Sequence, residues 1–498
     1  MVDRILKTTG RSRLGHTGCP TPKTSYWPSV TGSQLRYFGI AGLVGVSLVA
    51  CNVADHSPAR QSSAVSSTAG SAGSAKPSQP VTSIVAKEIR TEPLSPQPIR
   101  ITLASLPQPF ASDSVSKPPN VVPIPQNPVL KVPPGFVVNV FAEGLDRPRW
   151  LALTPTGDVL VTETPQNRIR LLRDGNGDGV AEVRKTFAGP ENGLEIPFGM
   201  AFAEGAFFLG NTTEVRRFAY TRGQEQLSGR GQKITDLPGG GYRQHWTRNV
   251  IVSPNQKKLF VSIGSRSNVD VEELPRASVQ VMNLDGSDRQ TFASGLRNPV
   301  GLAFHPTTGE LYTTVNERDG LGDDLVPDYL TRIQQGEFYG WPYAYLSPNH
   351  PDPNHLQNGQ SPRPDLVART RTPDVLFQAH SAALGLQFYD SKTFPAKYHN
   401  GAFVAFRGSW NRDQGTGYKI VFVPFGENGR PQGYYEDFLT GFLTNPAGPD
   451  TWGRPVGLLV LPDGSLLLTE EANGRIYRVQ YRGEQEVGYR ARGGESGD

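Results

Sequence analysis

The sequence has very few cysteines. Only 2 of its 498 residues are cysteine, Cys19 and Cys51, and both lie near the N-terminus. The chain after Cys51 therefore has no thiol for a disulfide framework or for nucleophilic catalysis. A domain formed by this part of the chain must be stabilised by packing, with a metal as the remaining candidate.

Several motifs that would identify a class of enzyme are also missing. The sequence has no Walker motif, no glycine-rich dinucleotide turn in a βαβ unit and no His-x-x-x-His zinc pair. The formal net charge is only +4, and acidic and basic residues are interspersed. Because there is no basic stripe with interleaved aromatic residues, the sequence does not favour a nucleic-acid partner.

The longest apolar run is Tyr37–Ala50, which is too short to cross a bilayer. Arg36 precedes this run, as a basic residue precedes the apolar part of a secretory signal. The run ends in Leu48–Cys51 (LVAC), which resembles the lipobox of bacterial lipoproteins. We expect residues 1–50 to be a lipoprotein signal peptide, with an ordinary signal peptide as the alternative.

This interpretation also predicts where the protein is located in the cell. It predicts an exported protein, periplasmic or at the cell surface, that meets the membrane only through lipid on Cys51. Residues 51–130 are rich in Ser, Ala and Pro without periodicity, which predicts a flexible tether. Residues 483–498 are polar and Gly-rich, and we expect a disordered tail there.

One short apolar phrase recurs six times between residues 131 and 482. Its last residues are spaced by 49, 50, 52, 84 and 72 positions. Four copies are followed by a turn and a second strand-like run, for example TPTGDVLVTE and LPDGSLLLTE. The six copies are RWLAL (Arg149–Leu153), FGMAF (Phe198–Phe202), RNVIV (Arg248–Val252), VGLAF (Val300–Phe304), LGLQF (Leu384–Phe388) and VGLLV (Val456–Val460).

A period of this length, carried by short strands, is typical of a β-propeller. The prediction is therefore an all-β, six-bladed β-propeller over residues 131–482. The last blade, residues 456–481, shows only about three strands. An alternating run at Gly135–Phe141 predicts a strand that completes this blade and closes the ring.

Three segments interrupt or decorate the repeat. Two insertions, residues 316–380 and 426–454, are where function is expected, because loops accept elaboration more readily than blades do. In the first blade, Asp174–Gly179 (DGNGDG) matches the first half of a calcium loop, but Lys185 stands at the twelfth position. A Gly-rich hairpin turn is the favoured alternative for this loop.

Charged residues recur at matching points of successive blades. His245, Arg297, Asn298 and Arg454 each stand just before a copy of the phrase, and Arg412 follows an outer strand of the fifth blade. In a propeller such positions converge on the central channel. Several arginines around one pocket suit a ligand with several carboxylates or phosphates, and a neighbouring histidine suits a base.

These residues lie in segments that resemble a known family. The segments HWTRNVIVSPNQKKLFVSIGS, GLRNPVGLAFHPTTGELYTTVNERDGLGDDLVPDYLT, YGWP, RGSWNR and GRPVGLLVLPDGSLLLTEE are similar to the glucose/sorbosone dehydrogenases. The resemblance covers about residues 132–481 and is closer to the sorbosone dehydrogenase-like branch. It implies a six-bladed quinoprotein that uses pyrroloquinoline quinone (PQQ) and Ca²⁺.

The resemblance also implies roles for individual residues. His245 matches the general base, and Arg297 with Asn298 matches the pair that contacts the cofactor. Arg412 and Arg454 match cations that face PQQ carboxylates. The segment Glu317–Asp324 matches the calcium-binding loop, which includes Glu317, Arg318, Asp319, Asp323 and Asp324.

One position departs from the family pattern. Ser265 stands where the glucose-oxidising branch has an aspartate that orients the histidine. Either Asp270 or another group takes this role, or the activity is weaker or directed at another substrate. His305 and His399 are expected to be structural, His380 to line the pocket without catalytic work, and Trp246, Trp341, Trp410 and Trp452 to be packing residues.

The predicted function is PQQ- and calcium-dependent oxidation of an aldose or sugar aldehyde. Hydride would pass to the quinone while His245 takes the proton, and electrons would leave to a quinone or a small redox protein. Two alternatives remain open. One is a propeller that binds a sugar or protein without turnover, and the other is a calcium-dependent lactonase.

Overall fold

The computed structural model describes residues 88–239 and 245–483 of the chain. The described part is almost entirely β structure, with one short helix, α1 (Pro364–Arg369), and a few 3₁₀ turns. None of its helices is long and apolar enough to span a membrane. The predicted signal peptide, Cys51, and the predicted tail after residue 483 lie outside the described residues.

Each copy of the repeated phrase begins a sheet, as predicted, and most sheets have a further three strands in sequence order. The first two sheets are β5 (Pro148–Leu153), β6 (Val159–Glu163), β7 (Arg168–Arg173), β8 (Val183–Ala188), and β9 (Met200–Ala203), β10 (Ala206–Gly210), β11 (Glu214–Ala219), β12 (Gln232–Asp236). The third is β13 (Val250–Val252), β14 (Lys258–Ile263), β15 (Ser278–Asn283), β16 (Gln290–Ser294) and β20 (Glu337–Phe338).

The remaining large sheets follow the same plan. The fourth is β17 (Asn298–Phe304), β18 (Leu311–Asn316), β19 (Tyr329–Ile333), β21 (Val375–Leu376), and the fifth is β22 (Ala383–Phe388), β23 (Ala402–Phe406), β24 (Lys419–Val423), β25 (Glu436–Leu439). The sixth is β28 (Pro455–Val460), β29 (Leu466–Glu470), β30 (Arg475–Tyr481), β4 (Phe136–Ala142), β1 (Glu88–Pro93) and β3 (Val129–Val132).

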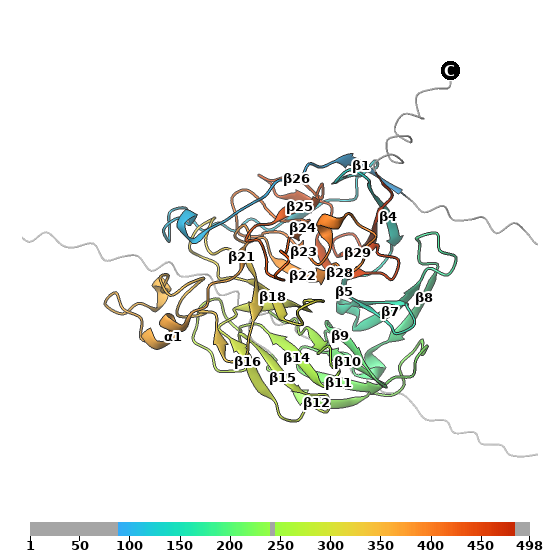
Figure 1. Ribbon diagram of the computed structural model, residues 1–498, viewed down its shortest axis with the longest axis horizontal. Helices are drawn as coiled ribbons and strands as arrows, with labels where there is room; N and C mark the ends of the chain where they lie inside the picture. Colours follow the sequence, from blue (N-terminus) through green and yellow to red (C-terminus); the bar gives the residue numbers. More distant parts are fainter. Residues whose placement is uncertain (1–87, 240–244, 484–498) are drawn as a thin grey trace, which may run out of the picture. The chain divides into compact units, whose positions relative to one another are not determined.

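The first strands of these sheets contact one another in a cycle. β5 contacts β9, β9 contacts β13, β13 contacts β17, β17 contacts β22, β22 contacts β28, and β28 contacts β5. Figure 1 shows β5, β9, β22 and β28 near the centre, with β8, β12 and β16 farther out. Loops at one end of these first strands are therefore brought together although they are far apart in sequence.

The glycine of the phrase is explained by close approach between neighbouring sheets. A Cβ atom on Gly301 would lie 2.4 Å from the carbonyl oxygen of Leu384, and one on Gly385 would lie 2.4 Å from that of Val456. Thr314, on the second strand, accepts the Gly301 N–H and donates to Leu384 O at 2.8 Å. The Gly301–Thr314 pair, and the equivalent Gly457–Thr469 pair, thus join a first strand to the next sheet.

Apolar side chains from the phrases fill the centre. Trp150, Phe198, Val300, Leu384 and Val456 form one buried cluster, against which Trp246 packs. Because five first-strand segments contribute to this cluster, the space between the sheets is filled at this level. Val300, Leu384 and Trp246 also line the cavities described below, so the cluster forms part of their floor.

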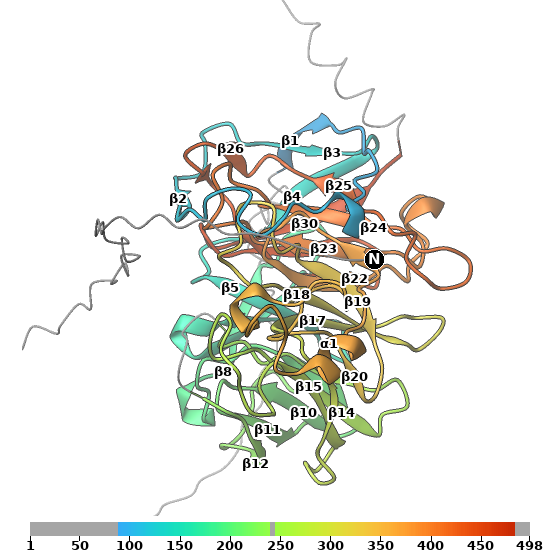
Figure 2. The same cartoon turned by 90° about the vertical axis from the view of Figure 1, so that its left-hand side faces the viewer.

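The predicted closing strand is confirmed. β4 pairs antiparallel with β30, with Val138 opposite Val479, and completes the sixth sheet. The outer edge of β4 is covered in turn, because β1 pairs with β4 and β3 pairs with β1. Figure 2 shows β1 and β3 beside β4. An edge that is paired in this way offers no free backbone groups to another chain.

The predicted flexible tether is wrong for residues 88–130. This segment, called here the N-terminal arm, carries β1, β2 (Asn120–Val121) and the start of β3. β2 joins β27 (Asp450–Thr451) and β26 (Leu443–Asn445) in a small three-stranded sheet. The arm gains its order from backbone hydrogen bonds to other segments, such as Ile99 N to Tyr435 O at 2.7 Å, which composition does not reveal.

Candidate active site

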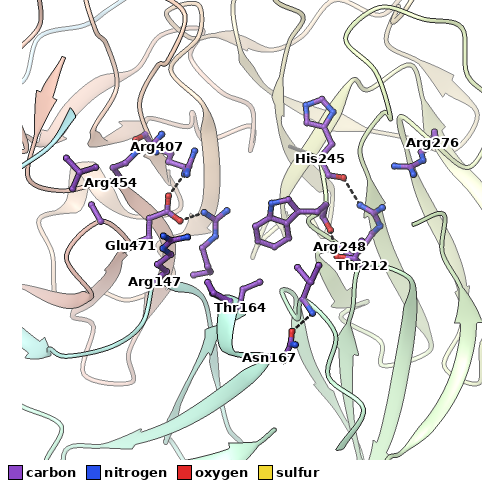
Figure 3. A pocket seen from close by; sticks show the side chains of 16 residues that line it. Arg147, Thr164, Asn167, Thr212, His245, Arg248, Arg276, Arg407, Arg454 and Glu471 are labelled. Carbon is purple, nitrogen blue, oxygen red and sulfur yellow. Dashed lines mark hydrogen bonds and ion pairs between the residues drawn. The ribbon is translucent and has the colours of Figure 1, made fainter. Parts of the chain in front are cut away.

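Two adjoining cavities lie at the loop end of the first strands. They have volumes of about 960 and 470 Å³ and share five lining residues: Arg149, His245, Trp246, Arg407 and Arg454. We call them the arginine lobe and the histidine lobe. Figure 3 shows the arginine lobe, with Glu471, Arg407 and Arg454 on one side and His245, Arg248 and Arg276 on the other.

The structure brings together four of the five residues predicted to surround the cofactor. His245, Arg297, Asn298 and Arg454 all line the histidine lobe, and His245 and Arg454 also line the arginine lobe. Each is held at the start of a first strand, or just before it, in the third, fourth and sixth sheets. Equivalent positions of successive sheets therefore converge on one cavity.

His245 is buried, at 5% exposure, and its ring orientation is fixed. Its Nδ1 lies 3.1 Å from the carbonyl oxygen of Ser265 and 3.0 Å from the Ser265 hydroxyl. The hydroxyl donates its own hydrogen to Ser267 O at 2.6 Å, so both Ser265 oxygens are acceptors toward Nδ1. This arrangement places the ring proton on Nδ1 and the basic lone pair on Nε2.

Burial and the neighbouring Arg297 guanidinium lower the pKa of His245 to about 3, so the ring is neutral at physiological pH. The carboxylate that acts in the opposite direction is Asp319, which raises this pKa electrostatically. Asp270 is exposed, so it does not serve as a buried partner of the ring. The role expected of an aspartate at position 265 is thus divided between Ser265, which orients the ring, and Asp319, which supplies charge.

The buried Arg297 forms an ion pair with the partly buried Asp319, with Nη2 3.0 Å from Oδ2. Arg297 also donates to the carbonyl oxygen of Glu317 at 2.5 Å. Burial alone would raise the pKa of Asp319, but Arg297 and His380 outweigh it and hold that pKa below its usual range. Asp319 is therefore an anion that fixes Arg297 beside His245.

The arginine lobe is strongly cationic. Of the described residues that line it, six are arginines and one, Glu471, is a carboxylate. Arg407 Nε donates to Glu471 at 2.5 Å, and Arg149 Nη1 donates to its other oxygen. The Arg454 guanidinium donates to the carbonyl oxygens of Arg407 and Gly408 at 3.4 Å and lies 6.0 Å from the centroid of the Tyr418 ring.

Arg149 and Arg407 were not found by the sequence analysis. Burial disfavours ionisation of Glu471, but Arg149 and Arg407 outweigh this and lower its pKa. Burial, together with Arg407, lowers the pKa of Arg454 to about 10, so it is still a cation at neutral pH. The group of three arginines and one carboxylate keeps an excess of positive charge in the cavity.

The prediction for Arg412 is wrong in its placement. Arg412 ion-pairs with Asp324 at 2.7 Å and contacts the carbonyl oxygen of Asp323. It is not among the described residues that line the two lobes. Gly408, with φ of 102°, turns the chain directly after Arg407. Arg407 therefore enters the cavity, and Arg412, five residues later, lies on the loop behind it.

The predicted calcium loop is divided in the same way. Glu317 and Asp319 line the histidine lobe, whereas Asp323 accepts the backbone N–H of Asp413 and Asp324 pairs with Arg412. Arg318 is buried against Asp352 at 3.0 Å. Asp323 and Asp324 are thus loop contacts, and Arg318 is a structural cation.

Within the described residues, no group of three or more His, Cys, Asp or Glu side chains is placed to hold a metal ion. Two buried oxygens in the histidine lobe nevertheless make no hydrogen bond, Glu317 Oε1 and Asn298 Oδ1. Burial raises the pKa of Glu317 to about 7. Amide and carboxylate oxygens are ligands that Ca²⁺ prefers, so each of these two residues is a candidate ligand of the ion.

The remaining predictions have mixed outcomes. His380 lines the histidine lobe as expected, bound to Gly322 O at 3.0 Å. Trp452 is a packing residue, as predicted, whereas Trp246 and Trp410 line the cavity. Trp246 supports Arg149, whose guanidinium lies 5.0 Å from the ring centroid.

The loop Asp174–Gly179 is a hairpin connection between β7 and β8. Asp174 accepts the backbone N–H groups of Gly177 and Gly179 at 2.7 and 2.8 Å. Glu182 accepts those of Gly175 and Asn176. These contacts use the carboxylates to hold the turn itself, which favours the hairpin interpretation.

Fold and site together define the class of protein. It is an all-β protein whose sheets surround a cation-lined cavity, with a buried neutral imidazole between two lobes. The family to which it belongs follows from comparison: the TrAA12-like family matches residues 130–482, and the chain belongs to that family. The predicted family resemblance is confirmed at this level, although the sorbosone branch is not singled out.

Known relatives agree with this assignment. An uncharacterized protein of Borreliella burgdorferi is 29% identical over 71% of this chain and 91% of its own length. A pyrroloquinoline quinone-dependent sugar dehydrogenase of Hypocrea jecorina is 24% identical over 70% of this chain and 88% of its own. The holo PQQ domain of a pyranose dehydrogenase from Coprinopsis cinerea has a similar fold, with a TM-score of 0.59, 20% identity, and coverage of 73% of this chain and 99% of that domain.

Proposed function

We propose that this protein is a six-bladed β-propeller that oxidises an aldose or a related sugar aldehyde with PQQ. The single observation that carries the proposal is the fixed, neutral His245 between an arginine-rich lobe and the Arg297–Asn298 pair. The cycle of contacts among the six first strands supports the propeller. Family membership and the quinoprotein relatives support the activity.

The residues of the cavity suit the cofactor. PQQ carries several carboxylates. Among the described residues that line the arginine lobe, Glu471 is the one carboxylate, and it pairs with Arg149 and Arg407. The lobes, at about 960 and 470 Å³, lie in the range of small-molecule sites. Arg454, with weak contacts at 3.4 Å, is the cation best placed to gain a partner from an anionic ligand.

When bound, PQQ supplies the acceptor for two electrons. The chain's own part is proton transfer and orientation. His245 Nε2 takes the proton of the sugar hydroxyl, since the contact of Nδ1 with Ser265 fixes the tautomer. Asp319 compensates part of the charge that His245 gains, and its ion pair with Arg297 holds that guanidinium in place.

We further propose that Ca²⁺ binds at Glu317 and Asn298, where two buried oxygens lack a partner. Asp319, on the same loop, would add negative charge nearby. The predicted lipid anchor at Cys51 and export from the cytoplasm remain proposals. So does electron delivery to a quinone or a small redox protein.

The test is reconstitution of the purified protein with PQQ and Ca²⁺, followed by dye reduction with aldoses and sorbosone. We expect turnover with wild-type protein and at least a 100-fold loss in His245→Gln, the usual scale for a general base. His399→Gln is the matched control, because His399 binds Phe394 O at 2.8 Å away from the cavity. Saturable PQQ binding without turnover would indicate a binding protein, and PQQ-independent lactone hydrolysis would indicate a lactonase.

A further inference from the structure

The N-terminal arm crosses the loops that surround the active site. Ser112 Oγ accepts the N–H of Asp323 at 2.8 Å, and Lys117 N donates to Trp410 O at 2.7 Å. Farther along, Asn120 N donates to Pro449 O at 3.1 Å. These contacts fall on the β18–β19 loop of the fourth sheet, the β23–β24 loop of the fifth sheet, and the turn between β26 and β27. The arm is therefore attached on both sides of the cavity.

Between these attachments the arm contributes directly to the cavity wall. Pro118 and Pro119 line the histidine lobe together with His245 and Arg297, and Val121 lines the arginine lobe. Val121 is also 44% exposed, so this part of the wall lies at the mouth rather than at the floor. The floor, in contrast, is formed by the central apolar cluster around Trp150 and Val300.

The wall is stiff, and the side chains of its two prolines carry no polar group. Neither proline has an N–H group, and each ring fixes its own φ. The flanking residues are held on both sides, because Lys117 Nζ donates to Asp413 O at 3.0 Å and Asn120 Nδ2 donates to Asp450 Oδ1 at 2.8 Å. A ligand that meets this wall cannot displace it by a side-chain rotation, and its hydroxyl groups find no N–H donor on the two prolines.

The arm lies outside the region that matches the family, which begins at residue 130. Pro118, Pro119 and Val121 are thus a feature of this chain that the family assignment does not describe. Since Pro118 and Pro119 line the histidine lobe together with His245, they border the space that a substrate of this base would enter, and Val121 borders the adjoining arginine lobe.

We propose that Pro118, Pro119 and Val121 form a specificity wall, which admits a monosaccharide to His245 and obstructs a sugar extended by further residues. This inference rests on the proposed function. The wall acts by size, because it is apolar and anchored, and it takes no part in proton transfer.

The test compares glucose with maltotriose in dye reduction by the PQQ- and Ca²⁺-reconstituted full chain. Pro118→Gly/Pro119→Gly loosens the wall, and we expect the ratio of kcat/KM for glucose to that for maltotriose to fall about tenfold, the scale of one apolar contact in a specificity pocket. Pro107→Gly/Pro109→Gly is the matched control in the same arm, because neither residue lines the two lobes as described. Val121→Trp, at an exposed position, should raise the same ratio.

A second measurement does not depend on turnover. Trp246 and Trp410 line the cavity, so acrylamide should quench tryptophan fluorescence more strongly in Pro118→Gly/Pro119→Gly than in the control variant. An unchanged substrate ratio in both wall variants, with turnover retained, would overturn the wall. If wild-type protein oxidises no sugar, the proposed function has failed, and equal quenching in the two proline variants would then overturn the wall separately.

Discussion

The burial of His245 predicts a specific loss of stability in mild acid. Its pKa is about 3 in the folded protein and about 6.5 in an unfolded chain. Above pH 6.5 neither the folded nor the unfolded state binds the proton, so the protonation of His245 does not change the free energy of unfolding. As the pH falls from 6.5 toward 3, only the unfolded state takes up the proton, and unfolding becomes easier. Each pH unit in this window corresponds to about 1.4 kcal/mol, so the loss between pH 7 and pH 5 is about 2 kcal/mol.

The assay is urea unfolding of the cofactor-free protein, followed by fluorescence, at intervals from pH 7 to pH 5. In His245→Asn the side-chain amide can still donate toward Ser265 but cannot titrate. Burial also lowers the pKa of His305 and His350, so wild-type protein alone does not isolate His245. We expect the free energies of unfolding of the two proteins to converge by about 2 kcal/mol as the pH falls. Parallel curves would refute the assignment of His245 as a buried, neutral imidazole.

Three further predictions concern the cavity. Glu471→Gln leaves two neighbouring arginines without their carboxylate and should lower the free energy of unfolding, measured in urea, by about 3 kcal/mol. The exposed control Glu427→Gln should change it by less than about 0.5 kcal/mol. A loss below about 1 kcal/mol for Glu471→Gln would contradict the ion cluster. Arg407→Ala should weaken PQQ binding at least about tenfold by fluorescence titration, and Arg412→Ala should weaken it less; the reverse order would show that the cavity was assigned to the wrong arginine. Ser265→Ala keeps the backbone carbonyl that accepts from His245 Nδ1, so kcat/KM should fall by less than about tenfold, the value of one neutral hydrogen bond. A larger loss would show that the hydroxyl of Ser265, and not its carbonyl, orients the ring.

The repeat was readable from sequence because packing between sheets imposes a glycine on four of the six copies and apolar residues on all of them. Gly301 and Gly385 are required where a neighbouring carbonyl lies 2.4 Å from the position of a Cβ atom, and Thr314 connects the two strands. Local chain geometry fixes these positions, so they recur with the period. Arg297 and Arg454 were found for the same reason, since they precede equivalent strands.

The residues that were missed depend on turns and on distant contacts. Arg149 opens the first copy of the phrase, so the rule that found Arg297 could also have found it. Arg407 is the first residue after β23, and a turn at Gly408 separates it from Arg412 in a way that sequence spacing does not show. The composition of the arm predicts a tether, because the contacts that order it, such as Lys117 N to Trp410 O, are not encoded in composition.

The pairing of β4 with β30 has a consequence for biosynthesis. Val138 meets Val479, which is made 341 residues later. At roughly 5–20 residues per second, a ribosome needs roughly 17–70 seconds to cover that distance. Throughout this interval β4 has been synthesised but β30 has not, so the apolar strand β4 stays unpaired on that side until translation is nearly complete. An mRNA that is truncated before the codons of β30 yields a polypeptide in which β4 cannot pair with β30. Such products should be substrates for chaperones and proteases.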